Sequence, residues 1–175
     1  MCDRVRILPG IEIAMPGGLD MLVLGADNPV YESLSSPSEV FAQACADGYL
    51  TVITQVRDRS AALPDYCALA DAVETVSCRQ LDPERTGLLR QYADTHRMAE
   101  LSGSAAEGLN YLNRYWIETL EPFSTPQEIR NIVLSRRYEN RSRESLGPSS
   151  PAYKAATLAE LAESDMMALY VQPTV

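Results

Sequence analysis

The residues that could do chemistry in this chain are few, and their spacing does not assemble a known catalytic set. The sole histidine, His96, precedes Glu100 by four residues, a spacing that on a helix can hold an acid–base pair but is more often an ordinary surface contact. Asp58, Asp65 and Asp71 supply carboxylates, yet nothing in their spacing fixes them together. We therefore predict no enzymatic activity, and a small enzyme that uses His96 or a carboxylate pair is the third hypothesis.

Motifs that hold cofactors or metals are also missing from the sequence. It contains no glycine-rich phosphate loop, no GxSxG elbow and no HExxH or clustered metal ligands. The four cysteines, Cys2, Cys45, Cys67 and Cys78, form no CxxC pair. On the helix expected below, Cys67 and Cys78 lie about 16 Å apart along the axis, too far for a disulfide. The sequence thus predicts no cofactor and no metal, with the cysteines as buried free thiols.

The charged residues are unevenly distributed. A formal net charge of −9 argues against nonspecific nucleic-acid binding by the protein as a whole. The segment 130–143 is basic, however, because it contains five arginines and only one acidic residue, Glu139. The arginines are Arg130, Arg136, Arg137, Arg141 and Arg143. We predict that these arginines contact a partner protein, and that any nucleic-acid contact is confined to them.

The stretch 63–101 gives the strongest periodic signal, and it predicts a hairpin of two antiparallel helices. Apolar residues recur at helical spacing in its first half: Tyr66, Leu69, Ala70, Val73, Val76 and Leu81. The second half begins with Asp82 as N-cap and Pro83 at the first helical position. It continues through Leu88, Leu89, Tyr92, His96 and Ala99 and is expected to stop at Ser102 and Gly103.

The part before this hairpin reads mainly as β-structure. RVRIL, IEIAM, DMLVLG and YLTVITQV within residues 1–56 are predicted strands of a small sheet, separated by proline–glycine turns and one insertion. The insertion carries a helix, because Ser36 and Glu39 form a capping box with Pro37 at the first helical position, and Gly48 ends it. This helix should cover one face of the sheet.

Two further helices and an arm are predicted after the hairpin. Ser104 is expected to cap a helix that contains Trp116, and Thr125 with Glu128 forms a second capping box. Residues 140–151 read as a polar linker. A last helix then carries an apolar stripe that could dock on the chain's own body or on a neighbour: Leu158, Leu161, Met166 and Leu169.

The predicted fold class is α+β, mainly helical: an antiparallel helical bundle with a small N-terminal β-sheet and an extended C-terminal arm. Residues 1–145 form one domain, with a β-rich part at 1–60 and a helical part at 61–145, and residues 146–175 form the linker, C-terminal helix and tail. There is no run of roughly 18 apolar residues and no signal-peptide core, so neither a membrane span nor a secretory signal is expected. A cytoplasmic protein is the default expectation.

The central stretch resembles the helical core of head–tail adaptor or connector proteins of tailed bacteriophages. The resemblance rests on YLTVITQVRD, Leu63-Pro64, CALADAVETVSCRQL and LLRQYADTHRMAEL. It implies a virion protein without catalysis that forms a homo-oligomeric ring and binds neighbouring virion proteins. The absent catalytic set, the arginine-rich extension and the terminal helix on a linker favour the same hypothesis of an assembly protein independently. The alternative is an acidic inhibitor or DNA mimic that binds a host factor.

Overall fold

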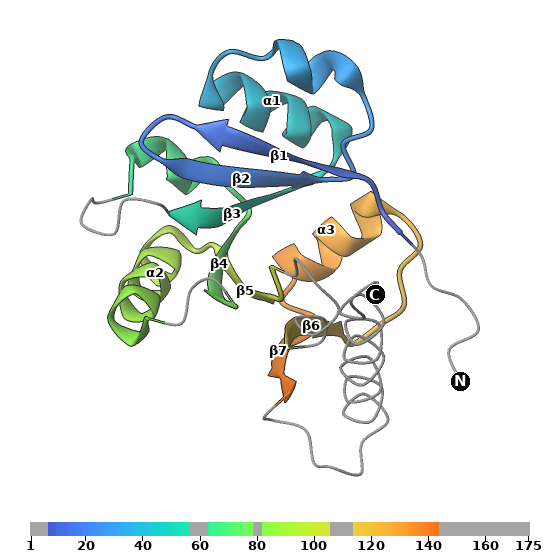
Figure 1. Ribbon diagram of the computed structural model, residues 1–175. Helices are drawn as coiled ribbons and strands as arrows, with labels where there is room; N and C mark the ends of the chain where they lie inside the picture. The colour runs from blue at the N-terminus through green and yellow to red at the C-terminus, as the bar shows by residue number, and fades with distance from the viewer. Residues whose placement is uncertain (1–6, 57–62, 79–81, 106–113, 144–175) are drawn as a thin grey trace, which may run out of the picture.

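The computed structural model describes residues 7–56, 63–78, 82–105 and 114–143, and these form a layered α/β structure (Figure 1). The strands are β1 (Gly10–Met15), β2 (Leu19–Leu24), β3 (Leu50–Val56), β4 (Ala72–Ser77), β5 (Ala99–Gly103), β6 (Tyr115–Thr119) and β7 (Tyr138–Ser142). The helices are α1 (Pro37–Asp47), α2 (Pro83–His96) and α3 (Pro126–Leu134), with 3-10 turns η1 (Pro29–Ser33) and η2 (Asp65–Leu69).

Five strands form one mixed sheet in the order β1-β2-β3-β4-β5. β2 runs antiparallel to β1 and to β3, whereas β3, β4 and β5 run parallel to one another. The parallel pair β4 and β5 is joined through α2, which packs against both strands. β6 and β7 form a separate antiparallel pair that contacts β5. The parallel half of the sheet therefore places the carboxyl ends of three strands at one end of the molecule.

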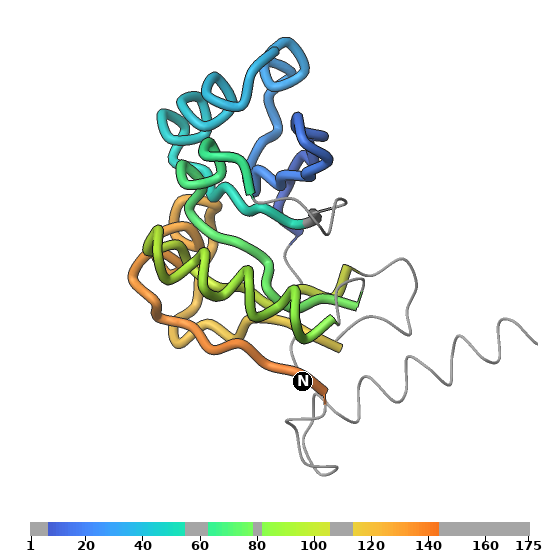
Figure 2. The backbone as a smooth tube through the Cα atoms, turned by 90° about the vertical axis from the view of Figure 1, so that its left-hand side faces the viewer, coloured from blue at the N-terminus to red at the C-terminus, as the bar shows by residue number. Residues whose placement is uncertain are grey.

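The two faces of the five-stranded sheet bury separate apolar clusters. One cluster joins α1 and α2 to the sheet through residues such as Phe41, Leu89 and Ile53. The other joins α3 to the opposite face, with Val133 packed near Val52. Alternating residues of the central strands supply the two clusters, as the twofold period of a strand requires. α1 and α2 thus lie on one side of the sheet and α3 on the other, and Figure 2 shows the molecule from the side on which α2 lies.

The predicted helical bundle is wrong, because the first half of the expected hairpin is a 3-10 turn followed by a strand. η2 ends at Leu69, and β4 then pairs with both β3 and β5. The β-branched residues Val73, Thr75 and Val76 suit a strand. The burial of Val73 and Thr75 in a strand with neighbours on both sides outweighs the helical spacing of the apolar residues. The mainly helical fold class is corrected to a sheet-based α/β arrangement.

The helix expected after Ser104 is also wrong where the structure describes it. Tyr115, Trp116 and Ile117 lie in β6, paired with β7, and Trp116 is half-buried. Consecutive aromatic and β-branched residues favour a strand over a helix. β7 in turn contains Arg141, which the sequence analysis had assigned to a polar extension.

Several local predictions are confirmed. Capping boxes at Ser36 and Thr125 begin α1 and α3, and Asp82 caps α2 with Pro83 at its first position. α2 nevertheless ends at His96, where Arg97 adopts a left-handed conformation. β1, β2 and β3 coincide with the strands expected at IEIAM, DMLVLG and YLTVITQV.

Some of the sequence-based predictions concern residues that the structure does not describe. These residues include the linker after 143 and the apolar stripe of the expected C-terminal helix: Leu158, Leu161, Met166 and Leu169. The proposed arm at 146–175 therefore stays a prediction. Of the strand expected at RVRIL, residues 4–6 lie outside the described residues, and Ile7 and Leu8 are described but belong to no strand. None of the described helices combines the length and apolar character needed to cross a bilayer.

Candidate functional site

The most unusual residue in the described structure is Arg85, in the first turn of α2. The buried face of this helix consists of Arg85, Leu89 and Ala93, which follow one another at intervals of four residues. Leu89 and Ala93 belong to the apolar cluster beneath the helix. The helical period therefore carries the guanidinium of Arg85 to the same side, and the residue is only 7% exposed.

The guanidinium of Arg85 has no partner in the part of the chain that the structure describes. Its Nε and Nη2 atoms are shielded from water and donate no hydrogen bond. No described carboxylate forms an ion pair with it. Burying an unpaired charge costs several kcal/mol, on the order of 3 to 5 kcal/mol where a partner has been removed. Arg85 is thus a buried cation whose Nε and Nη2 have no acceptor among the described residues.

The strand beneath the first turn of α2 is irregular at the same place. The register between β4 and β5 shifts between Glu74 and Val76, which leaves Thr75 without a partner in β5. Its carbonyl oxygen instead accepts a hydrogen bond of 3.2 Å from the hydroxyl of Thr86, the residue after Arg85. A β-bulge and the helix turn that carries Arg85 are therefore tied directly together. We call Arg85, Thr75 and Thr86 the Arg85 site.

The Arg85 site lies at the end of the sheet where ligands usually bind in open α/β proteins. Ligands of such sheets occupy the crevice beyond the carboxyl ends of parallel strands. Thr75 and the buried Ser77 are in the last part of β4, and α2 begins just after it. β3 has a similar irregularity near its own carboxyl end, where the pairing with β2 shifts at Thr54. Bulges of this kind are common next to functional sites.

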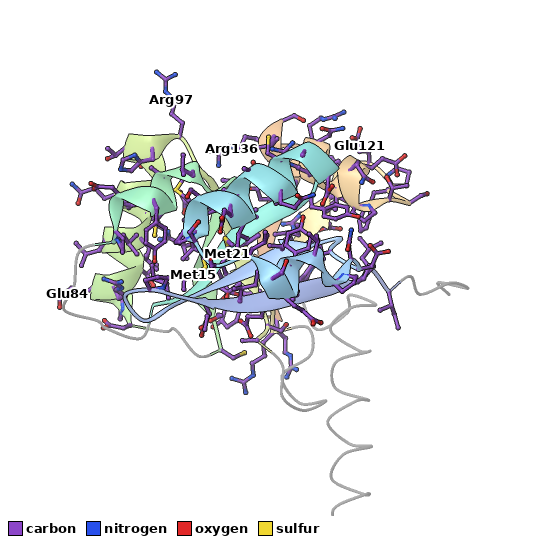
Figure 3. All side chains as sticks on the ribbon, turned by 90° about the horizontal axis from the view of Figure 1, so that it is seen from above. Met15, Met21, Glu84, Arg97, Glu121 and Arg136 are labelled. Atoms are coloured by element: carbon purple, nitrogen blue, oxygen red, sulfur yellow. The ribbon has the colours of Figure 1, made fainter. Side chains whose placement is uncertain are left out.

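The charges around the helix terminus do not explain Arg85. A positive side chain in the first turn is unfavourable, because the helix dipole is already positive there. Asp82 accepts a hydrogen bond from the backbone N–H of Glu84 and so caps the helix itself. Glu84 is exposed and lies at the outer edge of the molecule, whereas Met15 and Met21 lie inside it (Figure 3). The acidic residues thus serve the cap and the surface, and Arg85 remains unpaired within the described residues.

Arg130, in contrast to Arg85, is a cation that is paired with a carboxylate. Its Nε and Nη2 donate to the two carboxylate oxygens of Asp71 at 3.1 and 3.0 Å. Asp71 also accepts from the backbone N–H and the hydroxyl of Thr51 at 3.1 and 3.2 Å. Hydrogen bonding to Asp71 raises the pKa of Arg130 above its usual value. This cluster lies at the amino ends of β3 and β4 and fastens α3 to the sheet.

The other arginines assigned to partner binding also make contacts within the chain. Arg136 donates to the backbone carbonyls of Arg97 and Met98. Arg137 pairs with Glu121 at 2.7 Å and Arg141 with Glu118 at 2.8 Å. The backbone N–H of Arg143 donates to the carbonyl of Arg114 at 2.9 Å. Binding of a partner through Arg130, Arg136, Arg137, Arg141 and Arg143 stays a prediction, and at the first four of these residues it would compete with the side-chain contacts described here.

Among the described residues, the candidate catalytic side chains have separate partners. His96 ends α2 and stacks on Tyr92 with ring centroids 4.3 Å apart, whereas Glu100 lies in β5 and pairs with Arg90 at 3.3 Å. Asp71 is occupied by Arg130. Asp58 lies outside the described residues.

The thiols show no sign of a joint site in the described structure. Cys67 lies in η2 and is fully buried, and burial raises its pKa to about 11. Cys78 follows β4, and Cys45 is exposed on α1. Among the described residues, no three histidine, cysteine or carboxylate side chains are grouped as metal ligands.

Sequence analysis did not single out Arg85, although a signal was present. A basic residue precedes Leu89 by four residues and Ala93 by eight, so it falls on the apolar face of a helix whose start was correctly predicted. A long basic side chain on that face usually extends to solvent. Only the packing of the first turn against the bulged strand shows that this one does not.

Comparison with known proteins gives a fold likeness only. Neither a protein family model nor a curated protein matches the chain. The crystal structure of PsfC from Pseudomonas syringae PB-5123 is similar in fold, with a TM-score of 0.55 at 13% sequence identity. The alignment covers 90% of this chain but 66% of PsfC, just under two thirds of its length. The likeness to PsfC gives no support to the expected resemblance to phage connector proteins, which stays a prediction.

Proposed function

We propose that this protein binds a small anionic molecule at the Arg85 site. The observation that carries the proposal is the burial of the Arg85 guanidinium with Nε and Nη2 unsatisfied among the described residues. A ligand anion would supply the missing acceptor and offset the desolvation of the charge. The position beyond the bulge of β4, at the carboxyl end of the parallel strands, supports the same proposal.

Binding at this site requires the first turn of α2 to open. Nε and Nη2 are closed to water in the structure, so an anion reaches them only after a local movement. The first turn is the natural place for it, because terminal turns of helices are held by fewer hydrogen bonds than central turns. We therefore expect ligand binding to increase the protection of amide hydrogens in this turn.

The proposal is tested by thermal unfolding in a series of sodium salts at constant ionic strength. Anions that bind the folded protein raise the melting temperature relative to chloride, by roughly 3 °C or more when present at ten times their dissociation constant. Arg85→Met should abolish this increase. Arg90→Met is the matched control, because Arg90 is on the same helix but its side chain is 55% exposed.

Two results would contradict the proposal. One is the same melting temperature in every salt, with no added protection in the first turn of α2. The other is an anion effect that Arg85→Met retains in full, since the anion would then bind elsewhere.

Association with a partner protein is the second candidate function. It is favoured by large apolar side chains that remain exposed on the described surface: Ile7, Leu69, Leu88, Leu120 and Leu134. Leu120 and Leu134 belong to the same β6-α3-β7 part of the chain and are 65% and 46% exposed. The mass of the purified protein in solution tests this candidate, and a strict monomer at all concentrations that gains no partner would count against it.

A further inference from the structure

Arg130 and Arg85 present the same pair of guanidinium donors, Nε and Nη2, which is filled in Arg130 and has no described acceptor in Arg85. Arg130 uses Nε and Nη2, the two parallel donors on one side of the guanidinium, to hold both oxygens of the Asp71 carboxylate. In Arg85 the unsatisfied atoms are again Nε and Nη2. The filled fork shows that a carboxylate, which presents a planar pair of oxygens, fits these two donors.

Several polar groups of the first turn of α2 already have hydrogen-bond partners. The hydroxyl of Thr86 donates to the carbonyl of Thr75, and the backbone N–H of Thr86 donates to the carbonyl of Asp82. The backbone N–H of Glu84 donates to the side chain of Asp82. Among the described side chains of this site, the buried donors without an acceptor are Nε and Nη2, on one edge of the guanidinium. Two donors satisfy a carboxylate, whereas a phosphate needs donors around three oxygens.

The charge balance leads to the same group. Asp82 and Glu84 lie in the residues directly before Arg85, and the whole chain carries a net charge of −9. One guanidinium neutralises one negative charge. The second charge of a phosphate dianion would be left unmatched in a partly buried place on an acidic protein.

From these observations we infer that the ligand of the Arg85 site is a small molecule bearing a carboxylate, held side-on by Nε and Nη2. The inference rests on the proposed anion-binding function and specifies the class of anion. It excludes phosphate and sulfate groups as the principal ligands. The chemistry of the rest of the molecule is left open.

Arginine side-chain NMR tests the inference on the full-length protein. The Nε–H proton of an arginine moves downfield when it donates to a carboxylate. Arg130 serves as the internal standard of a filled fork. We expect titration with acetate or butyrate to move the Arg85 Nε–H resonance toward that of Arg130. Inorganic phosphate at the same ionic strength should bind at least roughly ten-fold more weakly, because one fork leaves its third oxygen and second charge unmatched.

Two variants establish that the fork itself binds. Arg85→Lys keeps the charge but presents a single ammonium, so carboxylate binding should weaken by roughly ten-fold or more. Arg90→Met should leave the titration unchanged, since Arg90 lies on the exposed side of α2. Full retention of binding in Arg85→Lys would overturn the side-on arrangement.

The possible results separate this inference from the proposed function. If phosphate binds through Arg85 as well as or better than the carboxylates, the carboxylate assignment fails and anion binding stands. If neither class moves the Arg85 signal, both fail. Both also fail if the ligand-free protein already shows the Arg85 signal at the position of Arg130, because a carboxylate of the chain itself would then fill the fork.

Discussion

Asn140 of β7 pairs with Ser102 of β5 through its side chain, accepting a hydrogen bond of 2.8 Å from the backbone N–H of Ser102. Its amide nitrogen donates to the carbonyl of Glu100 at 3.0 Å, so one side chain occupies both backbone groups as a neighbouring strand would. Tyr138 donates to the same carbonyl at 2.7 Å. These contacts close the edge of the five-stranded sheet and attach the β6-β7 pair to it.

Replacing Asn140 with Ala should release the backbone N–H of Ser102. Because Asn140 is exposed, water can replace the lost acceptor, and the free energy of unfolding should fall by only about 1 kcal/mol. The decisive measurement is hydrogen exchange, in which the Ser102 amide should lose protection while the amides of β2 and β3 keep theirs. Unchanged exchange at Ser102 would mean that this edge is not held by Asn140.

Removing the carboxylate of Asp71 should be far more damaging. Asp71→Ala leaves the partly buried Arg130 and the backbone N–H of Thr51 without their acceptor, and the expected loss is about 3 to 5 kcal/mol in urea unfolding. Arg137→Met is the matched control, because it breaks an exposed pair with Glu121 and should cost less than about 1 kcal/mol. Equal losses in the two variants would contradict the structural role of Asp71.

Gly25 and Gly87 should respond to Ala in opposite directions. Gly25 has a φ of +110°, and an added Cβ would lie 2.5 Å from Cβ of Pro126 and 2.6 Å from the ring of Tyr49. Gly25→Ala should therefore destabilise by about 3 kcal/mol or more, from strain and overpacking together. Gly87 lies in α2 with open space around it, so Gly87→Ala should stabilise by about 0.5 to 1 kcal/mol. The melting temperatures of the two variants, compared with that of the natural protein, test both expectations. An increase for Gly25→Ala would contradict the packing of α3.

Stability should fall in alkaline solution as Cys67 ionises. Its pKa is raised from 9.0 to about 11 by burial, so the folded state keeps the proton that the unfolded chain loses. The stability contributed by the neutral thiol is complete below pH 9.0 and disappears as the pH rises to about 11, a change of up to about 3 kcal/mol. Cys67→Ala should flatten this part of the pH profile. An identical alkaline decline in the variant would assign it to other groups, such as Tyr92, whose pKa burial raises to about 12.

Local signals in the sequence predicted the helix starts but not the architecture. The caps at Ser36, Asp82 and Thr125 depend on a few neighbouring residues, so they could be recognised without the fold. β4 could not be recognised in this way, because its apolar residues also fit a helical spacing. Pairing with β3 and β5 makes this segment a strand.

The Arg85 site could not be predicted from the sequence for a related reason. Helical periodicity places Arg85 on the inner face of α2, but it does not tell whether the guanidinium extends to solvent. The bulge at Thr75, which comes from strand pairing across β4 and β5, draws the first turn of the helix onto the sheet.

The stability of ligand-free Arg85→Met in urea tests the central claim most directly. Met has a similar length and no charge, so it removes the uncompensated cation and leaves the packing against β4 largely intact. We predict that the variant is as stable as the natural protein or more stable, by up to about 4 kcal/mol. A loss of more than about 2 kcal/mol, in the direction expected for Asp71→Ala, would show that Arg85 is already paired in the free protein and would contradict the account.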